Sequence, residues 1–164
     1  MVVDSFNVKG KMTLLEQTER EMIVDIRERA FLFSPDGNTI LINKEPEGER
    51  NEIDFSKEDP NLFDGNVLIH SHPNTDMAFR TFSDRDIRFF FSHKLKEFRM
   101  VKGRTVLSLV HEGNCSCNHD PVLILIELDR FLKSKQGVSE CSVNEFLRSF
   151  SCLCLTKRPI DISS

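Results

Sequence analysis

The chain has 164 residues, of which 39% are apolar and 29% are charged, and its formal net charge is -4. This length and balance fit one globular domain rather than a disordered chain, and no run of 18 apolar residues is present that could span a membrane. The acidic balance disfavours a nucleic-acid-binding protein, which usually presents a basic face to the phosphates.

The first half of the chain is predicted to form a helix followed by a hairpin. Within residues 11–26, apolar side chains recur at the spacing of one helix face, at Leu15, Met22, Ile23 and Ile26. Residues 28–43 contain two strand-like segments, ERAFLF and TILIN, separated by the turn signal SPDGN. The charged segment 45–50 is predicted to be a loop, and residues 51–56 to be a short strand at most.

The segment NVLIHSH is predicted to be a buried strand that ends in two histidines. Val67–Ile69 is a continuous apolar run, which is typical of a strand covered on both faces. His70 and His72 are two residues apart, so both side chains point to the same face of an extended backbone. Pro73 ends the strand because it has no N–H to donate to a ladder.

Ser83 is predicted to be the N-cap of the next helix. The residues after it have apolar side chains at helical spacing, namely Ile87, Phe90, Phe91, Leu95 and Phe98. Residues 96–113 are predicted to form two strands joined at Lys102 and Gly103.

Two helices are predicted to close the chain after a loop at residues 114–120. The first spans residues 121–135 and begins with Pro121, which suits a first helical turn. The second spans residues 142–153, where Ser142 and Glu145 predict a capping box. The predicted fold class is α+β (mixed α/β), with a central, mostly antiparallel sheet flanked by helices.

The two histidines and Asp86 make a candidate metal site. A catalytic zinc typically has three protein ligands and an open position for water, whose pKa it lowers from about 15.7 toward roughly 7. A nearby carboxylate could take the proton of that water, and Ser83, on the same helix face as Asp86, could donate to an oxyanion. H-x-H alone is a weak signal, and S-x-x-D alone is more often a capping box. Their conjunction in one short span favours zinc.

HSHP followed by FSDRDI resembles the core motif of the JAMM metalloproteases, also called the MPN or JAB domain. The resemblance implies Zn²⁺ held by His70, His72 and Asp86, with Ser83 assisting the oxyanion. It also implies an upstream catalytic glutamate, which points to Glu28. Glu21 is the alternative. Most of the other upstream glutamates, which include Glu19, Glu45 and Glu52, are interpreted as solvated charges.

The resemblance covers roughly residues 12–112 and is greatest to short JAB domains of phage and bacterial-toxin contexts. It implies a single JAB-like domain over residues 1–164, with cytidine-deaminase-like layering and a C-terminal helical extension at residues 114–164. One departure is the ten-residue segment 73–82, because the family usually has about seven residues there. Longer surface loops cost little in closure entropy. Met77 and Phe79 could cover a substrate, or could pack into the core together with Phe82.

The leading hypothesis is a zinc-dependent hydrolase of peptide or isopeptide bonds that acts on a protein or peptide substrate, such as a ubiquitin-like tail. The alternative is a non-catalytic MPN-type scaffold that binds partner proteins, and the longer loop could also signal such a degenerate copy. A DNA-associated protein of the RadC-like branch is a weaker third hypothesis, because the chain is acidic. His93 and His111 have no companion motif and are interpreted as surface or helix-face residues.

The five cysteines are expected to be reduced thiols of a cytoplasmic protein, because the N-terminal residues lack the pattern of a secretory signal. Four of them form two C-x-C pairs, and Cys141 stands alone. C-x-C is a poor match to the longer spacing of structural zinc sites, so a second zinc site is the less favoured hypothesis. The two C-x-C pairs are Cys115 with Cys117 and Cys152 with Cys154.

Overall fold

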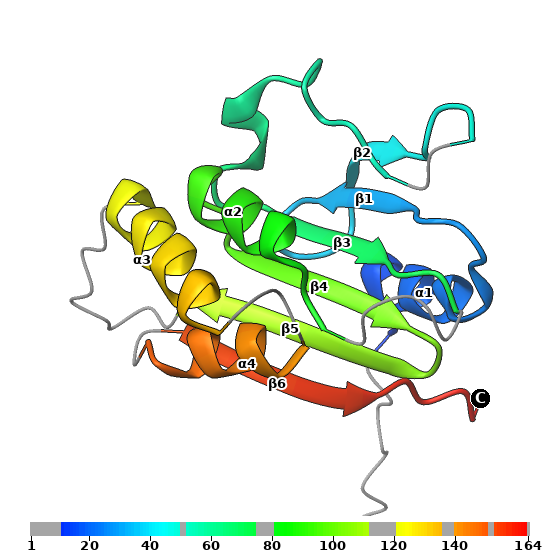
Figure 1. Cartoon of the computed structure of the whole chain (residues 1–164). Coiled ribbons are helices and arrows are strands. Elements are labelled where there is room, and N and C mark those ends of the chain that lie inside the picture. Colours follow the sequence, from blue (N-terminus) through cyan, green and yellow to red (C-terminus); the bar gives the residue numbers. More distant parts are fainter. Residues whose placement is uncertain are drawn as a thin grey trace, which may run out of the picture.

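The computed structural model describes residues 11–49, 52–74, 81–111, 121–135, 140–150 and 153–163 (Figure 1). The helices of this part of the chain are α1 (Leu14–Glu21), η1 (Met22–Val24), η2 (Pro60–Phe63), α2 (Asp84–Ser92), α3 (Pro121–Ser134) and α4 (Glu140–Arg148). Its strands are β1 (Ala30–Phe33), β2 (Ile40–Lys44), β3 (Val67–Ser71), β4 (Glu97–Lys102), β5 (Thr105–His111) and β6 (Leu153–Pro159).

The strands form a single sheet in the order β2-β1-β3-β4-β5-β6. All neighbouring strands are antiparallel except β3 and β4, which are parallel and are joined by α2. Parallel neighbours need a crossover connection, and α2 supplies it. The α+β fold class and the mostly antiparallel sheet are therefore confirmed.

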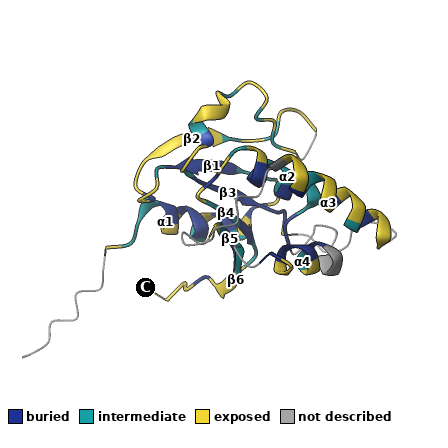
Figure 2. Cartoon of the chain, turned by 90° about the vertical axis from the view of Figure 1, so that its left-hand side faces the viewer, coloured by how far each residue is buried: buried dark blue, intermediate teal, exposed yellow. Residues whose placement is uncertain are grey.

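Helices cover both faces of the sheet, which places a core on each side. Figure 2, seen along the sheet, shows α1 on one side of the strands and α2, α3 and α4 on the other. Leu68 packs in the core under α2, α3 and α4, whereas Val67 and Ile69 pack in the core under α1. The strand with the continuous apolar run is thus buried on both faces, as predicted.

The N-terminal helix is shorter than predicted. A capping box of Thr13 and Glu16 starts α1, which ends at Glu21 and continues as one 3₁₀ turn to Val24. The backbone is extended at Asp25, whose carbonyl accepts a hydrogen bond from the Asn74 N–H at 3.0 Å. Ile26 is consequently exposed rather than on the buried helix face.

The predicted hairpin is confirmed as β1 and β2, although β1 begins at Ala30 rather than Glu28. Its turn contains Gly37 at a φ of 73°, where an added Cβ would lie only 3.1 Å from Leu15 Cβ, so glycine fits best. The segment 51–56, which is predicted to be a short strand at most, forms no strand over residues 52–56. Asp54 instead caps the backbone N–H of Ser56 in a turn.

The helix after Ser83 was predicted to run too far. Ser83 is the N-cap of α2, as predicted, but the helix ends at Ser92, and Lys94 has a positive φ of 51° that turns the chain. Leu95 and Phe98 are buried outside the helix, with Phe98 on β4. The predicted strand pair of β4 and β5 is confirmed, with Gly103 in the turn.

The closing segment contains a strand that the sequence patterns did not reveal. Helix α3 matches its prediction, but α4 begins at Glu140, so Ser142 lies inside the helix and not at its N-cap. Helix α4 ends at Arg148, and β6 pairs with the free edge of β5. Cys154 is a half-buried thiol on β6. The cysteines at 115, 117 and 152 and the side chain of Cys141 lie outside the description.

Among the helices that the structure describes, none combines the length and apolar character needed to cross a bilayer.

Candidate metal centre

The two histidines lie at the C-terminal end of β3, on the face covered by α2. His70 is 5% exposed and His72 is 7% exposed. The backbone between them is held from both sides. The Ser71 N–H donates to the Arg29 carbonyl at 2.9 Å, and the His72 N–H donates to the Val101 carbonyl at 2.8 Å. The spacing of the two imidazoles is therefore fixed by the sheet.

Asp86 is brought to the histidines by the capping box of α2. Its backbone N–H donates to Ser83 Oγ at 3.2 Å, and its Oδ2 accepts from the Ser83 N–H at 2.7 Å. The first turn of a helix also favours a negative charge. Asp86 is thus a helix-capping carboxylate that faces the end of β3.

Two distances between the three side chains match the ligand separation of a tetrahedral metal site. His70 Nε2 lies 3.4 Å from Asp86 Oδ1, and His72 Nε2 lies 3.4 Å from Asp86 Oδ2. One ligand atom from each residue falls within 4.8 Å of the other two. Ligands at roughly 2.1 Å from a tetrahedral zinc are separated by about 3.4 Å. This group can therefore hold a metal ion.

A backbone contact prepares His70 for ligation. Its Nδ1 lies 3.3 Å from the Arg99 carbonyl oxygen, which can only accept a hydrogen bond, so Nδ1 carries the proton and the Nε2 lone pair faces Asp86. Nε2 is buried and lies 3.4 Å from Asp86 Oδ1, but it has no hydrogen bond of good geometry. The ring is packed against Phe98, with centroids 4.9 Å apart. An unsatisfied buried nitrogen is rare, and a metal ion would account for it.

The charges of the three side chains support one another. Burial alone would raise the pKa of Asp86, but the adjacent His70 and His72 hold it well below its usual range. Burial would lower the pKa of His70, but the Asp86 and Glu28 carboxylates raise it above its usual value. The site thus attracts positive charge, whether this is a proton or a metal ion.

Glu28 lies beside this group. Ala30 pairs with His70 in antiparallel register, so two residues earlier the Glu28 side chain is expected on the face of both histidines. Burial raises the pKa of Glu28, the two histidines lower it, and Asp86 raises it. A depression of about 240 Å³, lined by residues 24–29, Glu45 and Pro46, opens next to it.

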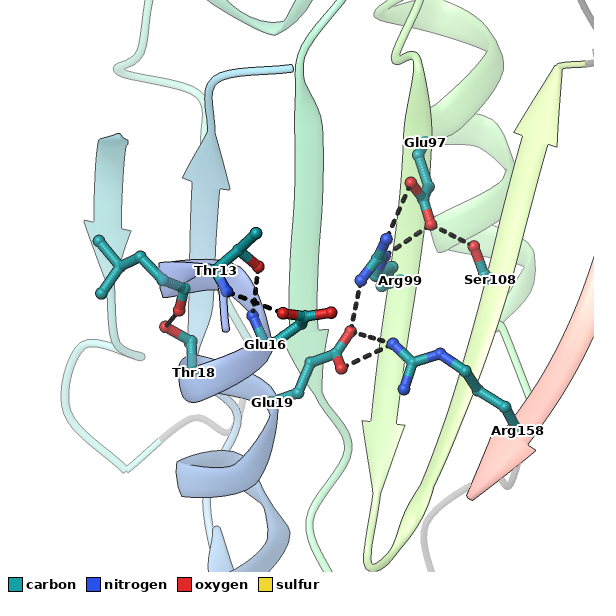
Figure 3. Close-up of polar contacts among 9 residues, drawn as sticks. Thr13, Glu16, Thr18, Glu19, Glu97, Arg99, Ser108 and Arg158 are labelled. Atoms are coloured by element: carbon teal, nitrogen blue, oxygen red, sulfur yellow. Dashed lines mark hydrogen bonds and ion pairs between the residues drawn. The ribbon is translucent and has the colours of Figure 1, made fainter. Parts of the chain in front are cut away.

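The other upstream glutamates occupy different surroundings. Glu19 is only 2% exposed and pairs with Arg99 and Arg158 on the α1 face of the sheet (Figure 3). Glu19 is therefore not one of the solvated charges. Glu21 and Glu45 are exposed, as is Glu52, which pairs with Arg85. These surroundings favour Glu28 over Glu21 as the carboxylate of the site.

Ser83 serves first as a helix cap. Its Oγ accepts the Asp86 N–H, which is the structural interpretation of the S-x-x-D pattern. A hydroxyl that accepts one hydrogen bond can still donate its own proton, so the cap does not conflict with the role implied for an oxyanion.

The segment 73–82 is anchored at both of its ends. The Asn74 N–H donates to the Asp25 carbonyl, and Thr81 Oγ1 donates to Asn144 Oδ1 on α4 at 2.6 Å. Phe82 is fully buried, which confirms the core alternative for this ring. Met77 and Phe79 lie outside the described residues, so their role as a substrate cover stays a prediction.

His93 and His111 take part in aromatic packing. The ring of His93 stacks on Phe89 with centroids 3.9 Å apart, and that of His111 stacks on Phe90 at 4.7 Å. Aromatic packing therefore explains the presence of both histidines without a metal site.

Sequence patterns missed the contacts that support the site. The Arg99 carbonyl that orients His70 is a main-chain group, which leaves no residue signature. Ser71 could have been identified as a supporting residue, because its hydroxyl lies between the two histidines in the sequence. Its Oγ accepts the Arg29 N–H at 3.0 Å and so fixes the backbone next to Glu28.

Comparison with models of protein families, with curated proteins and with solved structures finds no match. The argument for a metal centre therefore comes from the side chains themselves.

Proposed function

We propose that this chain is a zinc-dependent hydrolase of peptide or isopeptide bonds. The observation that carries the proposal is the largely buried His70–His72–Asp86 group, whose ligand atoms lie within 4.8 Å of one another and whose His70 Nε2 has no hydrogen bond of good geometry. The donor set of two imidazoles and one carboxylate is one that catalytic zinc commonly uses. The resemblance of the same residues to the JAMM motif supports the choice of reaction.

The roles of the residues follow from their positions. His70, His72 and Asp86 would hold zinc, which when bound supplies Lewis-acid activation of water and of the scissile carbonyl. Glu28 would take the proton of the attacking water and return it to the leaving amine. The partial burial that raises the pKa of Glu28 makes it a stronger base than an exposed carboxylate. Ser83 would donate its hydroxyl proton to the developing oxyanion.

Metal content is the first test. Protein purified in the presence of zinc and then desalted should contain one zinc per chain by elemental analysis. The double variant His70→Ala with His72→Ala should contain none, and Asp86→Asn should bind more weakly. Glu28→Gln should keep its zinc because Glu28 is not a ligand. Absence of zinc from the wild type, or its retention in the double variant, would overturn the proposal.

Cleavage is the second test. The probes are a fluorogenic peptide library and a ubiquitin–lysine isopeptide conjugate, each incubated with and without chelator. Glu28→Gln should lose cleavage while keeping zinc, whereas the matched control Glu21→Gln should remain active. A zinc-loaded wild type that cleaves neither probe would instead favour the non-catalytic scaffold.

A further inference from the structure

The depression next to the candidate metal centre shares a residue with it. Residues 24–29, Glu45 and Pro46 line this depression, so Glu28 belongs both to the candidate site and to the depression. Its volume of about 240 Å³ is smaller than that of most small-molecule pockets, which hold roughly 300–1,000 Å³. The depression therefore has the size to receive one side chain of a larger substrate.

Two exposed apolar side chains line the depression. Val24 is 75% exposed and Ile26 is 79% exposed, more than any other large apolar side chain in the described part of the chain. Pockets that bind ligands usually combine such apolar side chains with a few polar groups that fix orientation. Val24 and Ile26 thus offer an apolar surface to the aliphatic part of a bound side chain.

The carboxylate of Asp25 is the buried polar group of this lining. Asp25 is 8% exposed, and its Oδ2 has no hydrogen bond. Arg29 Nε lies 3.6 Å from this oxygen, which is too long for a hydrogen bond. Buried polar atoms without a hydrogen bond are rare in proteins. Asp25 therefore keeps an unused acceptor in the lining of the depression.

The two arginines of the lining already have other contacts. Arg27 Nη2 donates to the Gly48 carbonyl at 2.7 Å. The Arg29 guanidinium lies over the Phe31 ring, 5.2 Å from its centroid, where a cation is attracted to the aromatic face. Neither arginine is left to neutralise the carboxylates of the depression completely.

Glu45 adds a second carboxylate to the depression. It is exposed, and within the part of the chain that the structure describes no hydrogen bond or ion pair uses its side chain. Burial raises the pKa of Asp25, and the negative charge of Glu45 raises it further. The two carboxylates are therefore close enough to repel each other, and a cation near both would relieve this repulsion.

From these features we infer that the depression is a subsite for a basic side chain of the substrate, lysine or arginine, whose charged end lies near Asp25 and Glu45. Both side chains join an aliphatic stem to a cationic end, which matches an apolar surface next to two carboxylates. The position of this residue beside the scissile bond rests on the proposed function, because Glu28 is the candidate base. The affinity of the depression for a basic side chain does not depend on it.

Titration of the zinc-loaded protein with N-acetyl-lysine methylamide, followed by NMR, tests the subsite. The ligand should shift the backbone amide signals of residues 24–29 and of Glu45. N-acetyl-norleucine methylamide has a similar stem without the ammonium group, and should bind at least about fivefold more weakly, the upper end expected for one exposed ion pair. Glu45→Lys should weaken binding of the lysine ligand by a similar factor. Glu47→Lys, at an exposed glutamate of the same loop outside the lining, is the matched control.

Two more variants separate the stem from the charge. Ile26→Ala should weaken both ligands equally, because it removes apolar surface that both stems contact. Asp25→Asn should weaken only the lysine ligand. Ile26 and Glu45 are exposed, so their variants should keep the melting temperature of the wild type.

Three outcomes would each overturn the inference. The first is the absence of shifts at residues 24–29 when the lysine ligand is added. The second is equal binding of the lysine and norleucine ligands, which would mean that the depression does not recognise charge. The third is unchanged binding of the lysine ligand in Glu45→Lys.

Cleavage of the peptide library by the same variants separates this inference from the proposed function. The wild type should prefer peptides with lysine or arginine next to the cleaved bond, and Glu45→Lys should lose this preference while Glu47→Lys keeps it. If the wild type cleaves nothing but the titration responds as expected, the proposed function fails and the site for a basic side chain stands. If the wild type cleaves without this preference and the lysine ligand does not bind, the subsite fails and the proposed function stands.

Discussion

Replacing Phe82 by alanine should destabilise the domain and weaken its metal site together. The ring is fully buried, with centroids 5.2 Å from Phe98 and 6.4 Å from His70. The Phe82 ring therefore belongs to the aromatic side chains that pack around the His70 imidazole and hold it in place. The metal site and the core of the domain share this side chain.

The size of the effect follows from the burial. An aromatic side chain buries roughly 150–250 Å². At about 25 cal/mol per Å² this corresponds to roughly 4–6 kcal/mol, as an upper bound. Truncation of a buried phenylalanine to alanine typically costs about 3–5 kcal/mol. A chain of this length loses roughly 2–4 °C in melting temperature per kcal/mol, so Phe82→Ala should lower it by about 6–20 °C. Phe82→Leu, which keeps most of the volume, should cost under about 1.5 kcal/mol.

Urea unfolding of the chelated protein measures this difference. The chain has no Trp and no Tyr, so far-ultraviolet circular dichroism is the suitable probe. Zinc affinity measured against a competing chelator should fall in Phe82→Ala and recover in Phe82→Leu. A loss of stability below about 1 kcal/mol with an unchanged m-value would refute the reasoning, because it would mean that the ring is not held in the core.

Two further predictions concern charge. Zinc binding must displace the proton that the carboxylates favour on His70, so below the raised pKa of His70 the affinity should fall about tenfold per pH unit for each proton displaced. A chelator competition that gives a constant affinity from pH 5 to 8 would contradict this. On the other face, Glu19→Ala should cost about 3 kcal/mol, because it leaves the guanidinium of Arg99 short of a partner in a buried cluster. Glu21→Ala, exposed at the end of the same helix, should change the unfolding free energy by less than about 0.5 kcal/mol.

Local sequence patterns correctly predicted those helices and strands whose tertiary contacts match the pattern. The apolar run before His70 predicted a strand buried on both faces, and the Ser83 cap predicted the start of α2. Periodicity failed where tertiary contacts decide the end of an element. Phe98 continues the helical spacing of α2, yet it lies on β4 because Lys94 turns the chain. Strand β6 was missed because its pairing with β5 depends on a free sheet edge, which no local pattern reveals.

The same contrast holds for the site. Residue types and their spacing predicted that His70, His72 and Asp86 lie together, because the side chains that can bind a metal are visible in the sequence. The supporting groups could not be predicted, because the Arg99 carbonyl reaches His70 only through the parallel pairing of β3 with β4. The sequence could not single out Glu19 from the solvated glutamates for a related reason. Its burial depends on Arg99 and Arg158, which lie far from it in the sequence.

The parallel pair of strands explains how His70, His72 and Asp86 can meet across the ten-residue segment 73–82. The crossover through α2 places the end of β3 against the first turn of that helix, so the histidines and Asp86 meet where these two elements lie together. Asn74 is held by the Asp25 carbonyl, and Thr81 is held by Asn144 of α4. Additional residues between these two anchors lengthen the connection at a small entropic cost. The ten-residue spacing between His72 and Ser83 is therefore compatible with the candidate metal site.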